Sequence, residues 1–138
     1  MTISISSRTV AAVLLAGSAG LVTVPTPATA GGTVSWSYAP ANREAAGALA
    51  TGLRLYSIYN DVRGGSIRQR GQGNNAGLAQ RGRGNLGLVE QRGNGHSGTL
   101  EQDGDDNAYG LFQFGRGADD LIVQRGNGGS GATLSYGW

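Results

Sequence analysis

The amino-acid sequence predicts an all-β fold: a β-solenoid of about three two-strand coils with parallel stacked strands, preceded by a signal peptide and a flexible leader. Two observations lead to this prediction: a glutamine recurs every eleven residues, and a glycine follows each glutamine two positions later. The glutamines are Gln69, Gln80, Gln91, Gln102, Gln113 and Gln124. The glycines are Gly71, Gly82, Gly93, Gly104, Gly115 and Gly126. Short strands joined by tight turns need such a pattern.

We divide the chain into a secretory signal peptide (1–30), a leader (31–60) and the repeats (61–138). Arg8 supplies a basic start, Val10 to Val24 form an apolar stretch, and Ala28-Thr29-Ala30 suit signal cleavage. The apolar stretch is shorter than the ~20 residues that span a membrane. We therefore expect the mature chain to begin at Gly31 and to leave the cytoplasm.

The leader lacks the repeat. Asn42 is suited to cap a short helix that ends at Leu53 or Tyr56, whereas Gly47 and Gly52 weaken a helix there. The sequence leaves open whether this segment is disordered or partly helical.

Within each repeat, alternate positions up to the next glutamine share one strand face, which we expect to point inward. One inward position forms an asparagine ladder of Asn74, Asn85 and Asn107. Another forms an aliphatic core of Leu78, Val89, Leu100, Leu111 and Ile122. One repeat cannot close a ring, but two can, which gives a coil of 22 residues and a strand spacing of ~4.8 Å between coils.

Charges support this register. At a step of 22 residues Arg81, Asp103 and Arg125 follow one another, whereas a step of eleven would place Arg81 beside Arg92. Exposed ion pairs contribute only ~0–1 kcal/mol, so they select the register and add little stability.

The glutamines are expected to form two structural ladders, each made of every second glutamine along the chain. A buried amide without a partner costs ~1–3 kcal/mol, but stacked amides can donate to one neighbour and accept from the other. Gln69, Gln91 and Gln113 form the first predicted ladder, and Gln80, Gln102 and Gln124 form the second.

Asp120 falls at an inward position, where an unpaired carboxylate is costly. Either residues 118–120 loop out as a longer turn, or Asp120 points inward and slows strand pairing as a gatekeeper.

Several functional classes are disfavoured. The chain has no cysteine, and its net charge of +2 is too balanced for a nucleic-acid surface. His96, the single histidine, occupies an asparagine position, and Asp103, Asp105 and Asp106 lack the spacing of a calcium loop. We therefore predict no catalytic, cofactor or metal site and no enzyme activity.

The end of the repeats carries no recognisable cap, because Ser135 stands in the glutamine position and the sequence stops at Trp138. We expect open strand edges that template another chain. Outward-facing Leu86, Leu88, Phe112 and Leu134 form an apolar strip suited to bundling filaments. A monomeric binding module is the alternative, but it would need a row of identical outward residues.

The stretch Gln69 to Gln80, QRGQGNNAGLAQ, resembles the curlin repeat at every fixed position of the pattern Gln-x-Gly-x-x-Asn-x-Ala-x-x-x-Gln. Gln80 to Gln91 departs from the pattern at Gly87, and Gln102 to Gln113 departs at Tyr109. The resemblance covers about residues 58–138.

This resemblance implies a secreted subunit of curli amyloid fibres, which form a pilus at the cell surface for adhesion and biofilm matrix. It implies as partners copies of the chain itself, other curlin subunits, and an outer-membrane curli secretion pore with its accessory proteins; it implies no cofactor and no nucleic acid. Whether the chain is a major subunit or a minor, nucleating one stays open, although the Ala-rich leader looks slightly more like the minor type.

Overall fold

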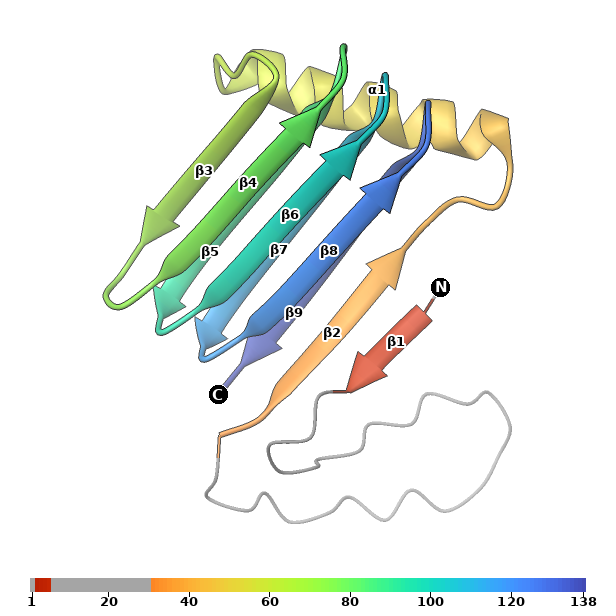
Figure 1. Cartoon of the computed structure of the whole chain (residues 1–138). Helices are drawn as coiled ribbons and strands as arrows, with labels where there is room; N and C mark the ends of the chain where they lie inside the picture. The colour runs from red at the N-terminus through yellow and green to blue at the C-terminus, as the bar shows by residue number, and fades with distance from the viewer. Residues whose placement is uncertain (1, 6–30) are drawn as a thin grey trace, which may run out of the picture.

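The protein is described from a computed structural model, which covers residues 2–5 and 31–138. Apart from Thr2–Ile5, the predicted signal peptide lies outside these residues. The repeats form two facing sheets, and the chain alternates between them strand by strand (Figure 1). The larger sheet contains β3 (Gly65–Arg70), β5 (Leu86–Asn94), β7 (Ala108–Arg116) and β9 (Ser130–Gly137). The smaller sheet contains β4 (Asn75–Arg81), β6 (Ser97–Asp103) and β8 (Asp119–Arg125).

The predicted fold class and its register are confirmed. All neighbouring repeat strands pair in parallel at a step of 22 residues, so that Gln69 pairs with Gln91, and Gln91 with Gln113. Arg81 pairs with Asp103, and Asp103 with Arg125, as the charge pattern predicts. Two strands and two turns therefore make one coil.

Glycine is required at the turns because the backbone there adopts positive φ. Gly71 has φ of 122°, and a Cβ added to it would overlap the carbonyl oxygen of Gly93 in the next coil. The other five glycines that follow a glutamine by two also have positive φ, with values from 84° to 129°. Any other residue would be strained there, which explains the period of the glycines.

The segment 31–60 adds a strand and a helix. Strand β2 (Thr33–Tyr38) pairs antiparallel with β9, and β1 (Thr2–Ile5) pairs antiparallel with β2. The expectation that the last repeat ends in an open edge is therefore wrong for the larger sheet, because β2 covers β9. In the part of the chain that the structure describes, β8 pairs with β6 alone and is an open edge.

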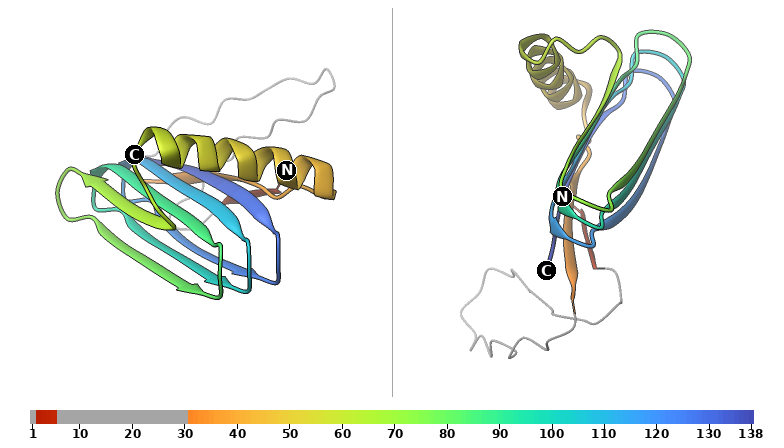
Figure 2. Two further views of the ribbon diagram at one scale, coloured as in Figure 1. Left: turned by 90° about the horizontal axis from the view of Figure 1, so that it is seen from above. Right: turned by 90° about the vertical axis from the view of Figure 1, so that its left-hand side faces the viewer.

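Helix α1 (Arg43–Tyr59) lies across the outer face of the larger sheet, on the side away from β4, β6 and β8 (Figure 2). Asn42 caps it, accepting a hydrogen bond of 2.8 Å from the Ala45 N–H. Leu53 packs against Leu86 and Leu88, which are 2% and 3% exposed. The expectation of an exposed apolar strip is therefore wrong at these two leucines. At 17 residues, α1 falls short of what a membrane-spanning helix requires, and no other helix in the described residues meets that requirement.

Candidate functional site

The two rows of glutamines form continuous hydrogen-bonded ladders. In the larger sheet, Nε2 of Gln69 donates to Oε1 of Gln91 over 2.8 Å, and Nε2 of Gln91 donates to Oε1 of Gln113 over 2.7 Å. In the smaller sheet the corresponding bonds join Gln80 to Gln102 and Gln102 to Gln124, at 2.8 and 2.9 Å. In each of these four bonds the donor is the glutamine nearer the N-terminal end of the stack, so both ladders have the same polarity.

Both ladders are fully hydrogen-bonded in their middle, and three of their four ends are open. The second N–H of Gln91 donates to the Asn75 carbonyl oxygen at 2.8 Å, and that of Gln102 donates to the Leu86 carbonyl oxygen at 3.1 Å. Gln91 and Gln102 are buried, whereas Gln69 and Gln80 are exposed and Gln124 is half-buried. Gln113, the last glutamine of the larger sheet's ladder, is 0% exposed and donates to Asp120. The amides of Gln69, Gln80 and Gln124 are therefore the ladder ends that are accessible to further partners.

The asparagines at the predicted ladder positions bind backbone groups rather than one another. Oδ1 of Asn85 accepts from the Asn107 N–H at 3.0 Å, while its Nδ2 donates to the Gly104 carbonyl oxygen at 2.8 Å. Asn107 makes the same two contacts one coil further on, with Gly129 and Gly126. Each asparagine thus ties one turn to the next.

His96 occupies the asparagine position one coil after Asn74. Its ring accepts a hydrogen bond from a backbone N–H of the next coil, as the asparagine side chains do. Oδ1 of Asn74 accepts from the His96 N–H at 3.0 Å, and Nδ1 of His96 accepts from the Ala118 N–H at 3.1 Å. Its Nε2 lies 3.3 Å from the Arg92 carbonyl oxygen. Since Nδ1 is the acceptor, Nε2 carries the proton and donates. His96 is 1% exposed and acts as a structural link.

The predicted aliphatic core lies between the two sheets. Val89, Leu100 and Leu111 are at most 1% exposed, and Leu78 and Ile122 pack against them as partly buried neighbours near the two ends. Tyr109 fills a position that is small in most repeats, and its hydroxyl lies 2.8 Å from Oγ1 of Thr133. Burial raises the pKa of Tyr109. The core is therefore tightly filled in the middle coils and thins toward the ends.

Asp120 lies within β8 and pairs with Gly98 of β6, and its carboxylate points inward to the buried Gln113. The segment is therefore a strand rather than a looped-out turn. Oδ2 of Asp120 accepts from Nε2 of Gln113 at 2.7 Å, and Oδ1 accepts from Oγ of Ser35 at 3.1 Å. The first ladder thus ends on a carboxylate that also contacts β2.

The contact between β2 and β9 is one that the sequence reasoning missed. Oγ of Ser35 lies 2.7 Å from Oγ of Ser135, and Oγ of Ser37 lies 2.8 Å from Oγ1 of Thr133. The sequence pattern that indicates β2 is the alternation of hydroxyl residues with Val34, Trp36 and Tyr38 over residues 33–38. This alternation is typical of a half-buried strand.

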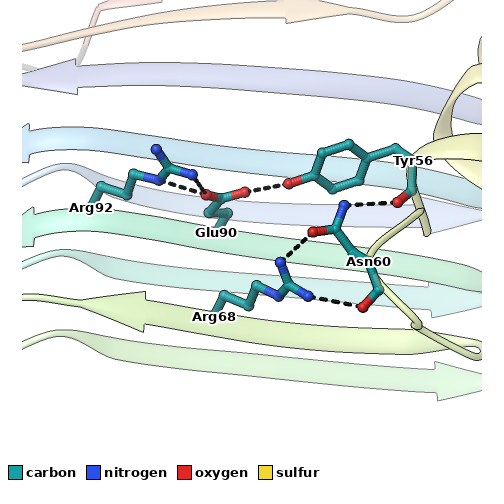
Figure 3. Close-up of polar contacts among 5 residues, drawn as sticks. All are labelled: Tyr56, Asn60, Arg68, Glu90 and Arg92. Carbon is teal, nitrogen blue, oxygen red and sulfur yellow. Dashed lines mark hydrogen bonds and ion pairs between the residues drawn. The ribbon is translucent and has the colours of Figure 1, made fainter. Parts of the chain in front are cut away.

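A polar cluster joins α1 to the larger sheet (Figure 3). Oη of Tyr56 donates to Oε2 of Glu90 over 2.7 Å, and the Arg92 guanidinium lies 2.6 Å from Oε1 of the same carboxylate. Arg68 donates to the side chain and the backbone of Asn60, just past the end of the helix. The cluster therefore holds the C-terminal half of α1 on β3 and β5.

This cluster shifts two pKa values. Burial of Glu90 raises its pKa, but the hydrogen bonds from Tyr56 and Arg92 and the charges of Arg92 and Arg68 outweigh burial, so the pKa lies below its ordinary value. The pKa of Tyr56 is raised by its hydrogen bond to Glu90 and by burial. The Arg81–Asp103 pair, in contrast, is exposed and 4.0 Å apart, so it contributes little.

Acidic and histidine side chains do not gather in threes anywhere in residues 2–5 and 31–138, so no metal-binding cluster is found there. The arrangement presents instead two polar ladders that are buried in the middle, an open ladder end at Gln124, and an unpaired strand edge at β8. Such an arrangement can be extended by another strand, because the same amide and backbone groups can pair with that strand.

Comparison with known families gives one match. The model of the curlin associated repeat matches residues 82–115, which include β5 and β6 and most of β7. No curated protein and no solved structure matches the chain significantly.

Proposed function

We propose that this curlin-repeat protein is a secreted structural subunit that self-assembles into curli-type amyloid fibres for surface adhesion and biofilm matrix. One observation carries the proposal: the ladder of the smaller sheet has an exposed acceptor end at Gln80 and a half-buried donor end at Gln124, and the ladder of the larger sheet has an exposed acceptor end at Gln69. A stacked copy could therefore accept a hydrogen bond from Gln124 and continue the ladder of the smaller sheet.

The backbone supports the same proposal. β3 and β4 are edge strands at one end of the stack, and β8 is an edge strand at the other, among the described residues. Long edges with apolar neighbours invite pairing with another chain. On the outer face of β8, Leu121 and Val123 are 69% and 46% exposed.

The match to the curlin associated repeat, rather than the geometry, supports the proposed partners and location. We propose that the partners are copies of this chain and other curlin subunits, together with an outer-membrane secretion pore and its accessory proteins. We further propose export by a signal peptide, a cell-surface location and a structural rather than a catalytic role. A minor, nucleating role is a variant of the same proposal.

A specific observation favours a second candidate, a monomeric secreted β-solenoid. β2 covers β9, which is how a solenoid that stays monomeric protects its last strand. The outward residues of the small sheet are heterogeneous, however: Thr99, Leu121 and Glu101 share no chemistry that would form a repeated binding row.

Dilution from denaturant tests the proposal. The chain, in full length and from Gly31, should form thioflavin-positive fibres after a lag. Gln124→Glu keeps the oxygen that accepts from Gln102 but removes the donor at the end of the ladder, so we expect the elongation rate to fall at least several-fold.

Asn127→Asp is the matched control, because it adds the same charge and keeps the oxygen that accepts from the Asp105 N–H in an exposed turn. It should elongate like the parent chain. A soluble monomer that persists under all these conditions would favour the monomeric alternative and refute the fibre proposal.

A further inference from the structure

The repeats contain an odd number of strands. The seven strands β3 to β9 alternate between the sheets, so the larger sheet has four levels and the smaller sheet has three. At two strands per coil, the solenoid is three and a half coils long. The first end of the stack is level, with β3 and β4 side by side, whereas at the other end β9 stands one level beyond β8.

This half-coil step leaves one strand position beside β8, at the level of β9. In the described part of the chain no strand occupies it. Ile122 and Gln124 of β8 point inward beneath this position and are only half-buried, whereas Leu100 and Gln102 at the same positions of β6 are 0% and 2% exposed. The position is therefore the natural place for the next strand of a continuing solenoid.

We propose that a second copy of this chain joins this end with a half-turn about the stacking axis, so that its β3 pairs with β8 and its β4 pairs with β9. This inference rests on the proposed assembly into fibres and specifies its geometry. Because eleven-residue repeats are equivalent in the two sheets, the strand that follows β9 can come from the start of another copy.

The side chains fit this arrangement. Continuing the step of 22 residues places Gln69 of the second copy above Gln124 and Ile67 of the second copy above Ile122. Nε2 of Gln124 lies at the donor end of its ladder, and Gln69 is at the acceptor end of the other, so the ladder continues with the same polarity. Gly65 of the second copy falls opposite Asp120 and leaves room for the carboxylate.

Stacking without the half-turn would leave a defect. If β3 of the second copy paired with β9, its β4 would lie two levels above β8, and one strand level of the smaller sheet would be empty. The facing N–H and C=O groups of both strands would then lack partners inside the fibre, where each such group costs ~1–3 kcal/mol. The half-turn fills every level.

The half-turn requires β2 to leave β9, since β2 occupies the place of the incoming β4. Ser35 and Ser37 of β2 satisfy Ser135 and Thr133 in the single subunit. In the fibre, Gln80 and Leu78 of the second copy would face these two residues. β2 is therefore a removable cap whose release opens the growing end.

Cross-linking between copies tests the half-turn. The chain has no cysteine, so mixtures of full-length variants that carry one cysteine each report only on contacts between copies. Val123 and Leu134 are matched positions, because they face outward on β8 and β9 and are 46% and 43% exposed. Fibres of Arg68→Cys mixed with Val123→Cys should give disulfide-linked pairs on oxidation, because the half-turn places residue 68 beside residue 123.

Arg68→Cys mixed with Leu134→Cys should give at least tenfold fewer linked pairs. A preference for position 134, equal linking at both positions, or no linking at either in well-formed fibres would overturn the half-turn. If no variant and no parent chain forms fibres, the proposed function itself fails, and that outcome is seen before any oxidation.

A second pair tests the cap. Ser35→Cys with Ser135→Cys in one chain should lock β2 on β9, whose hydroxyl oxygens lie 2.7 Å apart. The oxidised protein should not elongate fibre seeds, and reduction should restore the parent rate. The control pair Arg81→Cys with Asp103→Cys links β4 to β6 and should elongate in both states. If the oxidised Ser35→Cys, Ser135→Cys variant elongated seeds as fast as the same variant after reduction, the removable cap would be overturned.

Discussion

Nε2 of Gln113 donates to Oδ2 of Asp120 over 2.7 Å, so the ladder of the larger sheet ends on a carboxylate of the facing sheet. One level further, Ser135 holds the glutamine position but is too short to continue the ladder. Since Ser35 of β2 donates to the other oxygen of Asp120, the end of the ladder is linked to the cap on β9.

Asp120→Ala should shorten the lag before assembly, because it removes an acceptor that holds β2 and an inward charge at the growing end. Thioflavin fluorescence at equal protein concentration measures the lag. Asp120→Asn keeps one acceptor oxygen, so its lag should lie between those of the parent and Asp120→Ala. An Asp120→Ala lag equal to that of the parent would contradict the gatekeeping role.

Gln91→Ala should destabilise the folded chain by about 2–4 kcal/mol, because it leaves Gln69, Gln113 and the Asn75 carbonyl oxygen without a shared partner and opens a cavity. Denaturant unfolding followed by circular dichroism gives this value. Gln69→Ala removes an exposed glutamine at the ladder end and should cost less than about 1 kcal/mol. Equal losses for the two variants would contradict the greater contribution assigned to the buried middle of the ladder.

His96→Asn should be well tolerated, since asparagine at this position elsewhere binds the same kind of backbone groups. His96→Leu has no acceptor for the Ala118 N–H and should lower the free energy of unfolding by about 1–3 kcal/mol. Thermal unfolding of the two variants compares them directly. A leucine variant as stable as the asparagine variant would show that an acceptor for the Ala118 N–H adds no stability at this position.

Acid should loosen α1 from the sheet. The pKa of Glu90 lies below its ordinary value in the folded chain, so its contribution is present above the unfolded pKa of ~4.3 and is lost as the pH falls through the folded value. The pKa of Tyr56 is raised, so its contribution is present below ~10 and is lost as the pH rises through the folded value.

Stability measured between pH 3 and 7 should therefore fall on the acid side in the parent and stay flatter in Glu90→Gln. The glutamine variant can still accept from Tyr56 but carries no titrating carboxylate. If stability fell equally with acid in both proteins, the loss would come from other carboxylates and not from Glu90.

Leu53→Ala should destabilise the docked helix by about 2–4 kcal/mol, because Leu53 is 6% exposed and packs on Leu86 and Leu88. Leu55→Ala, two residues along the same helix, changes a side chain that is 62% exposed and should have little effect. Protease sensitivity of residues 43–59 measures the docking. Equal sensitivity of the two variants would contradict the packing of α1 described above.

The repeat portion of the fold could be predicted from the sequence because its interactions recur. The glutamine step of eleven and the alternation of Arg81, Asp103 and Arg125 are enough to specify a coil of 22 residues, and the strand pairing has this register. Positive φ at glycines such as Gly71 explains why the turn residue repeats as well.

The cap and the helix could not be predicted in the same way, because each contact occurs once and joins residues far apart in the chain. Ser35 and Ser135 are 100 residues apart and belong to no shared motif. Leu86 and Leu88 have the spacing of an outward face, and only the docking of Leu53 explains their burial. Inward Asp120 was ambiguous for the same reason, since its partner Ser35 lies outside the repeats.

Mass per unit length of the fibres, measured by scanning transmission electron microscopy, tests the central claim that each subunit enters the fibre as a solenoid. Seven strands at two per coil and ~4.8 Å per coil predict one chain for every ~17 Å of a single filament. One chain for every ~4.8 Å would mean that each chain lies flat in a single layer, and this result would contradict the account.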